Sequence, residues 1–99
     1  MEWLWTWDGT SFGYRDEDNL WTHDGKHAGR FYEDEVYGKD GCYLGEIRKG
    51  RLITHTTKKS KCKSAFTSRS DRVGRVNRVD YVGYLMLAGF EDFPDPSRF

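Results

Sequence analysis

The sequence predicts an all-β protein, built as an array of 16-residue β-hairpin repeats. Three consecutive stretches match in phase, and they cover Trp5–Leu20, Trp21–Val36 and Tyr37–Leu52. Each stretch opens on an aromatic residue, carries Asp-Gly three residues later, and has a second glycine four residues after the first. The third observation is composition: four Trp, six Tyr and six Phe favour an aromatic core. No segment shows helical periodicity with caps.

Each repeat is expected to turn at its Asp-Gly pair, at residues 8–9, 24–25 and 40–41. Asp-Gly between two β-prone runs is a strong signal for a hairpin with a two-residue turn, whose two central positions need positive φ. With turns centred there, Trp5 is expected to face Phe12 across the first hairpin. The strands that follow from these turns are 3–7, 10–15, 19–23, 26–32, 35–39, 42–48 and 51–55.

One aliphatic residue of each repeat is expected to lie opposite a glycine on the neighbouring strand. The pairs are Leu4 with Gly13, Leu20 with Gly29, and Val36 with Gly45. A glycine at such a position leaves room for a backbone or a ring to approach closely. Because one repeat is too short to bury its own face, the repeats are expected to cover one another.

We interpret residues 1–99 as one domain with three parts. Residues 1–52 hold the three repeats, 53–83 form a divergent basic segment, and 84–99 supply a closing strand and a tail. Within the basic segment, valine recurs every third residue in the run RVG-RVN-RVD-YVG, which fits neither a strand nor a helix face. An extended path with three residues per turn is one interpretation. We expect Tyr84–Leu87 to be a buried strand and Asp95–Phe99 to be loose.

Charge is distributed unevenly in a chain whose formal net charge is zero. Residues 1–52 carry a net charge of −4, residues 53–83 carry +6, and residues 84–99 carry −2. One interpretation is intramolecular, with the basic segment packed against acidic hairpin loops. The other is an anionic partner.

The phased repeats, the segment Gly45–Thr54, the Lys/Ser tract and the ending Gly83–Pro94 together resemble the four-fold beta flower family of uncharacterised bacterial proteins. The resemblance implies hairpins arranged with pseudo-fourfold symmetry around an axis. The weak fourth repeat would then be completed by a segment near Tyr81–Phe90. The family carries no assigned activity, so the resemblance implies no functional residues.

No group of residues predicts catalysis, a cofactor or a metal site. The three Asp-Gly aspartates are explained by their turns, and His23 and His27 are expected on opposite faces of one hairpin. No phosphate-binding glycine loop is present. Cys42 and Cys62 lack metal or redox spacing, so we expect reduced thiols in a cytoplasmic protein. The start of the chain does not resemble a signal peptide, and no association with a membrane is expected.

We therefore expect a non-catalytic binding or scaffolding module whose partner is an unidentified protein or a second copy. Self-association would use hairpin edges or an aromatic face, with Trp3 and Trp7 as the rings that the core does not need. The alternative is binding of nucleic acid or another polyanion through the basic segment. Its candidate residues are Lys58, Lys59, Lys61, Lys63, Arg69, Arg72, Arg75 and Arg78.

Overall fold

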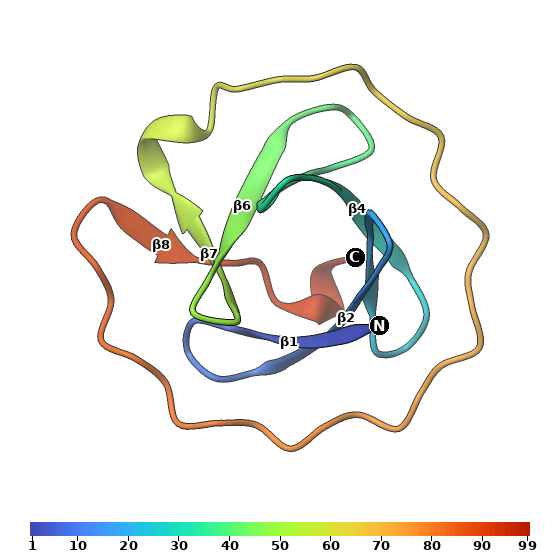
Figure 1. Ribbon diagram of the computed structural model, residues 1–99, viewed down its shortest axis with the longest axis horizontal. Helices are drawn as coiled ribbons and strands as arrows, with labels where there is room; N and C mark the ends of the chain where they lie inside the picture. Colours follow the sequence, from blue (N-terminus) through green and yellow to red (C-terminus); the bar gives the residue numbers. More distant parts are fainter.

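Seven consecutive strands close into a barrel in the computed structural model, which describes residues 1–99 (Figure 1). They are β1 (Glu2–Thr6), β2 (Ser11–Asp16), β3 (Asn19–Thr22), β4 (His27–Tyr32), β5 (Glu35–Tyr37), β6 (Tyr43–Arg48) and β7 (Arg51–His55). Each strand pairs antiparallel with the next. A parallel pairing of β1 with β7 closes the ring. The fold is therefore all-β, as predicted.

The hairpins turn at the predicted Asp-Gly pairs, but each turn is one residue longer than the expected form. In the first hairpin, Gly9 N–H donates to the Thr6 carbonyl and Thr6 N–H donates to the Thr10 carbonyl. Within the turn, only Gly9 takes a positive φ, of 96°. The Asp8 carboxylate accepts hydrogen bonds from the Thr6 hydroxyl and the Thr10 amide, which holds the loop. This is a turn followed by a glycine bulge.

The bulge changes the register that we predicted beyond Leu4. Trp5 lies opposite Ser11 and not opposite Phe12, so that prediction is wrong. The same shift follows Leu20 in the second hairpin and Val36 in the third. The extra residue in each turn therefore displaces the pairing by one position at the strand end next to the turn.

The expected pairing of aliphatic residues with glycines is confirmed in all three hairpins. The pairs are Leu4 with Gly13, Leu20 with Gly29, and Val36 with Gly45. A β-carbon at Gly29 would lie 2.7 Å from the Tyr37 carbonyl oxygen, and one at Gly45 would lie 2.6 Å from the Phe93 ring. The second glycine of each repeat thus lets a backbone or a ring come close, as its position predicts.

The C-terminal segment fills the barrel instead of lying loose. The barrel core contains Leu4, Phe12, Leu20, Ala28, Phe31, Val36, Leu52 and Phe93. The rings of Phe93 and Phe99 stand edge-on to Phe12, with centroids 5.4 and 5.5 Å away. Asp95 caps the short 3₁₀ helix η2 (Pro96–Arg98), and the C-terminus lies inside the ring in Figure 1. The prediction of a loose tail is wrong because aromatic residues anchor it.

The strand β7 takes its second partner from the far end of the chain. Where a fourth repeat would have its Asp-Gly turn, the short 3₁₀ helix η1 (Thr56–Lys58) follows β7. The strand β8 (Phe90–Asp92) then pairs antiparallel with β7. The closing strand is thus Phe90–Asp92, and our placement of a buried strand at Tyr84–Leu87 is wrong, since Leu85 is 92% exposed.

Candidate interaction surface

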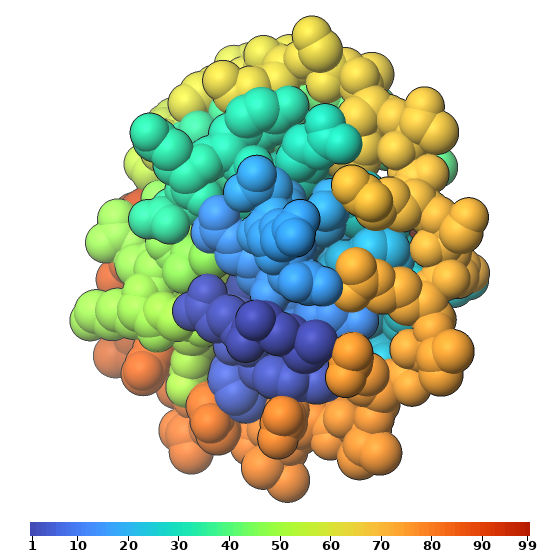
Figure 2. All heavy atoms as spheres, turned by 45° about the vertical axis from the view of Figure 1, so that its right-hand side comes forward, coloured from blue at the N-terminus to red at the C-terminus, as the bar shows by residue number.

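Residues 59–88 form an extended belt around the outside of the barrel. In Figure 1 the belt runs as a wide arc from η1 to β8, and Figure 2 shows its yellow and orange residues along the barrel wall. It passes the loops of the third, second and first hairpins in that order, as its hydrogen bonds show. The belt is neither strand nor helix, which is what the three-residue period of the sequence indicates.

The belt is attached to each hairpin loop through two of its own amides, three residues apart. The amides of Lys63, Arg72 and Tyr81 donate to the glycine carbonyls of the three Asp-Gly pairs, each at 2.8 Å. Those of Phe66, Arg75 and Tyr84 donate to the carbonyls of Lys39, His23 and Trp7 at 2.8–3.1 Å. Nine belt residues therefore span the same arc as one 16-residue repeat.

The Asp-Gly glycines are needed for the belt as well as for the turns. A β-carbon at Gly9 would lie 1.9 Å from the Tyr81 carbonyl oxygen, and one at Gly25 would lie 2.0 Å from that of Arg72. Neither distance is compatible with a side chain. The backbone conformation and the close approach of the belt thus act together to require glycine.

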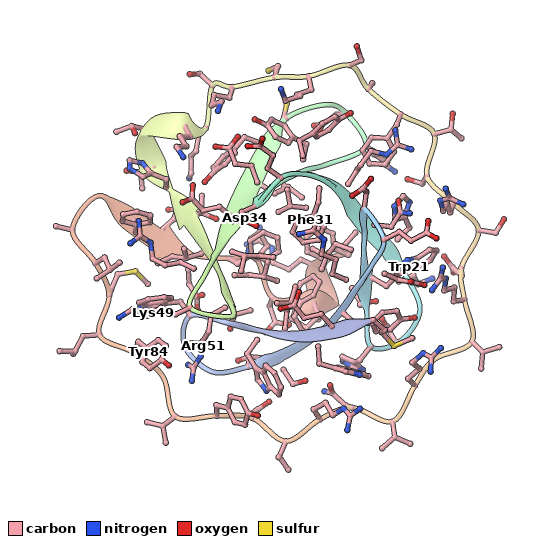
Figure 3. The ribbon with its side chains drawn as sticks, in the orientation of Figure 1. Trp21, Phe31, Asp34, Lys49, Arg51 and Tyr84 are labelled. Atoms are coloured by element: carbon pink, nitrogen blue, oxygen red, sulfur yellow. The ribbon has the colours of Figure 1, made fainter.

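One row of belt side chains, the inner row, faces the barrel wall, and most of its members lie on aromatic rings of that wall. Its members are Lys63, Phe66, Arg69, Arg72, Arg75, Arg78, Tyr81 and Tyr84. The guanidinium of Arg72 lies 4.0 Å from the centre of the Trp21 ring, which Figure 3 shows on the wall facing the belt. Arg75 lies 5.3 Å from the Tyr14 ring. These are cation–π contacts, each with a favourable electrostatic interaction.

The tryptophans of the first hairpin are covered by the end of the belt. Tyr81 stacks on Trp5 at a centroid distance of 4.1 Å, and Arg78 lies 4.8 Å from the Trp3 ring. Trp7 is 2% exposed and donates its indole N–H to the Leu85 carbonyl at 2.9 Å. The expectation that Trp3 and Trp7 remain free is therefore wrong for Trp7, and Trp3 is half-buried.

A buried arginine joins the belt to the point where the barrel closes. Arg51, on β7, is 6% exposed and donates to the carbonyls of Val82 at 2.8 Å and Trp7 at 3.3 Å. Its guanidinium also lies 3.9 Å from the Tyr84 ring, and Figure 3 shows the two side chains beside each other. One cation on β7 thus contacts both the first hairpin loop and the belt.

A second row, the outer row, points away from the barrel, and its side chains change from polar to apolar along the belt. Its members are Ser64, Thr67, Ser70, Val73, Val76, Val79, Val82 and Leu85. The apolar members are 79–92% exposed. We call Val73, Val76, Val79, Val82 and Leu85 the apolar ridge. The sequence signal for it was the three-residue valine period, which we could not assign to a face without the barrel.

The structure does not bring the eight predicted polyanion-binding residues together in one patch. They follow the belt around the rim, and Lys58, Lys59, Lys61 and Arg72 already pair with carboxylates. Lys63 lies over the Tyr32 ring at 5.2 Å. Arg69, Arg75 and Arg78 have no carboxylate partner. Four of the eight basic residues are thus paired with carboxylates within the molecule, and our intramolecular interpretation accounts for that half.

The densest ion-pair cluster holds the start of the belt against β5 and β6. Lys58 Nζ lies 3.0 Å from both Glu35 and Glu46, and Lys61 Nζ lies 2.9 Å from Glu35. Burial alone would raise the pKa of Glu35, but hydrogen bonds from Lys61 and Lys58 lower that pKa to about 2. Every charge in this cluster has a partner of opposite sign. We therefore interpret the cluster as one that attaches the belt to the barrel.

No three His, Cys, Asp or Glu residues lie together in a way that would hold a metal ion. An open groove of about 700 Å³ lies beside β8, with Glu91, Asp92 and Asp95 in its lining. Burial and the neighbouring Asp8 charge raise the pKa of Asp92. Lys59, which also lines the groove, pairs with Glu91.

Comparison with known proteins identifies no relative of this chain. None of the helices has the length and the apolar character needed to cross a membrane. No family model, no curated protein and no solved structure matches the chain.

Proposed function

We propose that this chain is a non-catalytic protein-interaction module that docks its partner on the apolar ridge of the belt. The observation that carries the proposal is the ridge itself: apolar side chains at every third position from Val73 to Leu85, 79–92% exposed. Single exposed apolar residues are ordinary on protein surfaces, whereas a contiguous apolar surface is typical of an interaction site.

The belt conformation does not explain the valines. The outer row begins with Ser64, Thr67 and Ser70, which sit at the same three-residue spacing and are also exposed. Polar side chains therefore suit the outward position in the same extended path. The switch to valine from residue 73 onward gives the fold no buried area, so we attribute it to a contact outside the chain.

The chemistry around the ridge favours a partner with an apolar groove and acidic side chains at its rim. Arg75 and Arg78 lie over rings of the barrel wall, but both remain exposed and have no carboxylate partner within the chain. A protein groove with carboxylates along its edges would contact both the valines and these cations. A second copy fits poorly, because two convex ridges bury little area and a two-fold contact would bring like charges together.

Two of the surfaces expected for self-association are occupied within the chain. The parallel pairing of β1 with β7 leaves no free edge at the barrel closure, and the inner row covers the aromatic wall. Polyanion binding through Lys58–Arg78 is disfavoured because half of the candidate cations are already paired. The apolar ridge is therefore the surface that best supports binding.

We also propose that the four-fold beta flower family is the group to which this architecture belongs. Four antiparallel pairs support the proposal: β1–β2, β3–β4, β5–β6 and β7–β8. Arranged in this order around the barrel, they would form a pseudo-fourfold array of hairpins. In this proposal the belt is the long connection between the two strands of the fourth pair, and it displays the ridge.

The test replaces ridge valines by residues of the same shape. Val76→Thr, Val79→Thr and Val82→Thr combined keep the β-branched side chains that suit an extended backbone. A photo-crosslinking residue at position 79 identifies the bound protein in an extract of the source cells, with position 67 as the control site. The purified partner is then titrated against the wild type and the triple variant. We expect at least a tenfold loss of affinity in the variant and an acidic rim on the partner's groove.

Several outcomes contradict the proposal. Equal affinity of the wild type and the triple variant would remove the ridge as the docking surface. Dimerisation that the variant abolishes would make a second copy the occupant. Ridge-dependent binding to anionic vesicles, or to nucleic acid in a gel shift at low salt, would replace the protein partner by a membrane or a polyanion.

A further inference from the structure

We propose that Cys42 and Cys62 form a redox-controlled clasp, in which a disulfide fastens the start of the belt to the third hairpin. Both cysteines are free in the structure, and they are the only two in the chain. They come from different elements: Cys42 follows the Asp-Gly turn of the third hairpin, and Cys62 lies on the belt. This inference is independent of the proposed function.

The backbone places the two cysteines directly opposite each other. Cys42 and Cys62 form an antiparallel bridge. The flanking hydrogen bonds run from Tyr43 N–H to the Lys61 carbonyl at 3.1 Å and from Lys63 N–H to the Gly41 carbonyl at 2.8 Å. These bonds surround the pair and do not join it, which defines a non-hydrogen-bonded pair.

That class of pair has the geometry that a disulfide needs. In a non-hydrogen-bonded antiparallel pair the Cα atoms are about 4.5 Å apart and the side chains lie closest together. Disulfides span Cα separations of about 4.4–6.8 Å. The Cα separation typical of this class of pair therefore lies within the range that a disulfide spans.

The second hairpin supplies an internal comparison. Residue 26 occupies the place of Cys42 in its own repeat, and residue 71 lies nine belt positions after Cys62. Lys26 Nζ pairs with Asp71 Oδ2 there at 2.6 Å. The chain thus joins the belt to a hairpin tip at equivalent places, by an ion pair in the second hairpin and by two thiols in the third.

Access and charge assign different roles to the two thiols. Cys62 is exposed, whereas Cys42 is half-buried. The hydrogen bond and the negative charge of Asp40 raise the pKa of Cys42. Cys62 is thus the thiol that reacts first with an external oxidant, and Cys42 is the thiol that resolves the intermediate.

The oxidant is a low-molecular-weight disulfide, such as oxidised glutathione. The Cys62 thiolate attacks one of its sulfurs, the S–S bond breaks, and one small thiol leaves. The Cys42 thiolate then attacks the Cys62 sulfur of the mixed disulfide and expels the second small thiol. The protein gives up two electrons and two protons, which reduce the small disulfide to two thiols, and the bond closes a loop from residue 42 to residue 62.

The test titrates the full chain in glutathione buffers of increasing oxidised fraction. We expect the oxidised chain to be monomeric, to lose the mass of two hydrogens, and to melt about 10 °C higher than the reduced chain because the closed loop restricts the unfolded state. Cys42→Ser and Cys62→Ser each serve as a control and are expected to show no such rise. The pair Cys42→Lys with Cys62→Asp copies the ion pair of the second hairpin and is expected to melt at one temperature in all buffers.

Three results would overturn the clasp. They are thiols that stay free when oxidised glutathione predominates, disulfides that join two chains, and separate glutathione adducts on both cysteines. A further variant tests the geometry alone: Lys26→Cys with Asp71→Cys, in a chain with serines at 42 and 62, is expected to form the same kind of internal bond. Its failure to do so, together with failure of the native pair, would show that the belt does not hold these positions close.

Discussion

The barrel and the belt are held by different interactions, although the same chain forms both. In the barrel, neighbouring strands share ladders of hydrogen bonds and enclose fully buried side chains such as Phe12 and Leu52. In the belt, hydrogen bonds to the barrel recur mainly at every third residue, and the side chains lie on a wall instead of in a core. The comparison teaches that the barrel is stabilised by contacts among its own strands, whereas the belt keeps its extended path through contacts with the barrel.

The largest expected difference between the two regions comes from truncating one side chain in each. Phe12→Ala removes a ring with no exposed surface that contacts Phe93 and Phe99, and we expect it to lower the free energy of unfolding by about 3–5 kcal/mol. Val79→Ala, at a side chain that is 79% exposed, should change that free energy by less than about 0.5 kcal/mol. Urea denaturation followed by tryptophan fluorescence measures both. A loss at Val79 as large as that at Phe12 would contradict the exposed ridge.

Two glycine substitutions separate the cost of the turn conformation from the cost of displacing the belt. Gly25 and Gly50 both have positive φ, of 95° and 73°, but a β-carbon meets the Arg72 carbonyl only at Gly25 and meets nothing within 4 Å at Gly50. Gly50→Ala should therefore cost about 1 kcal/mol for the backbone conformation alone. Gly25→Ala should cost about 2–3 kcal/mol, because the belt must also move away.

Hydrogen exchange distinguishes the two effects of the glycine substitutions. In Gly25→Ala the amides of Arg72 and Arg75, which donate to the second hairpin loop, should exchange faster than in the wild type. In Gly50→Ala their exchange should change only as far as global stability does. Equal exchange in the two variants would mean that the belt does not rest on Gly25.

Lowering the pH should weaken the start of the belt before it weakens the core. The pKa of Glu35 is lowered to about 2 from 4.5, so its ion pairs stabilise the fold fully above pH 4.5 and lose that effect as the pH falls toward 2. Since Glu35 is partly exposed, we expect this carboxyl to contribute about 1 kcal/mol. Urea denaturation of the wild type and of Glu35→Gln, measured from pH 7 to pH 2, should give curves that converge at low pH. Parallel curves would contradict the lowered pKa.

The sequence predicted best those regions whose contacts join residues close together in the chain. The hairpins depend on neighbours in the chain, so Asp-Gly and the spacing of Leu4 and Gly13 were enough to place the turns and the glycine pairs. The bulge was missed because the Asp8 carboxylate holds the loop through Thr6 and Thr10. Two-residue turn rules do not include such side-chain contacts.

The belt and the tail could not be placed from local rules. A three-residue period separates inward from outward side chains only when the segment lies along another surface. The inner row could therefore be recognised only once rings such as Trp21 and Tyr14 had a position on the barrel wall. Phe93 and Phe99 gave a usable signal, since two aromatic residues near a chain end are poorly suited to solvent. The valine ridge was visible as a period, but its exposure depends on the path of the whole belt.

The smallest expected effect tests whether the cation–π contacts hold the belt. Arg75 and Arg69 both lie on the inner row without a carboxylate partner, but only Arg75 lies over a ring, that of Tyr14 at 5.3 Å. Arg75→Gln should therefore weaken the attachment of the belt by about 0.5–1 kcal/mol, whereas Arg69→Gln should not. Hydrogen exchange of the Arg72 and Tyr81 amides should accelerate by about 2–5-fold in the first variant only. Equal rates in the two variants would assign the attachment to the backbone hydrogen bonds alone, and the basic charge of the belt would then need another explanation.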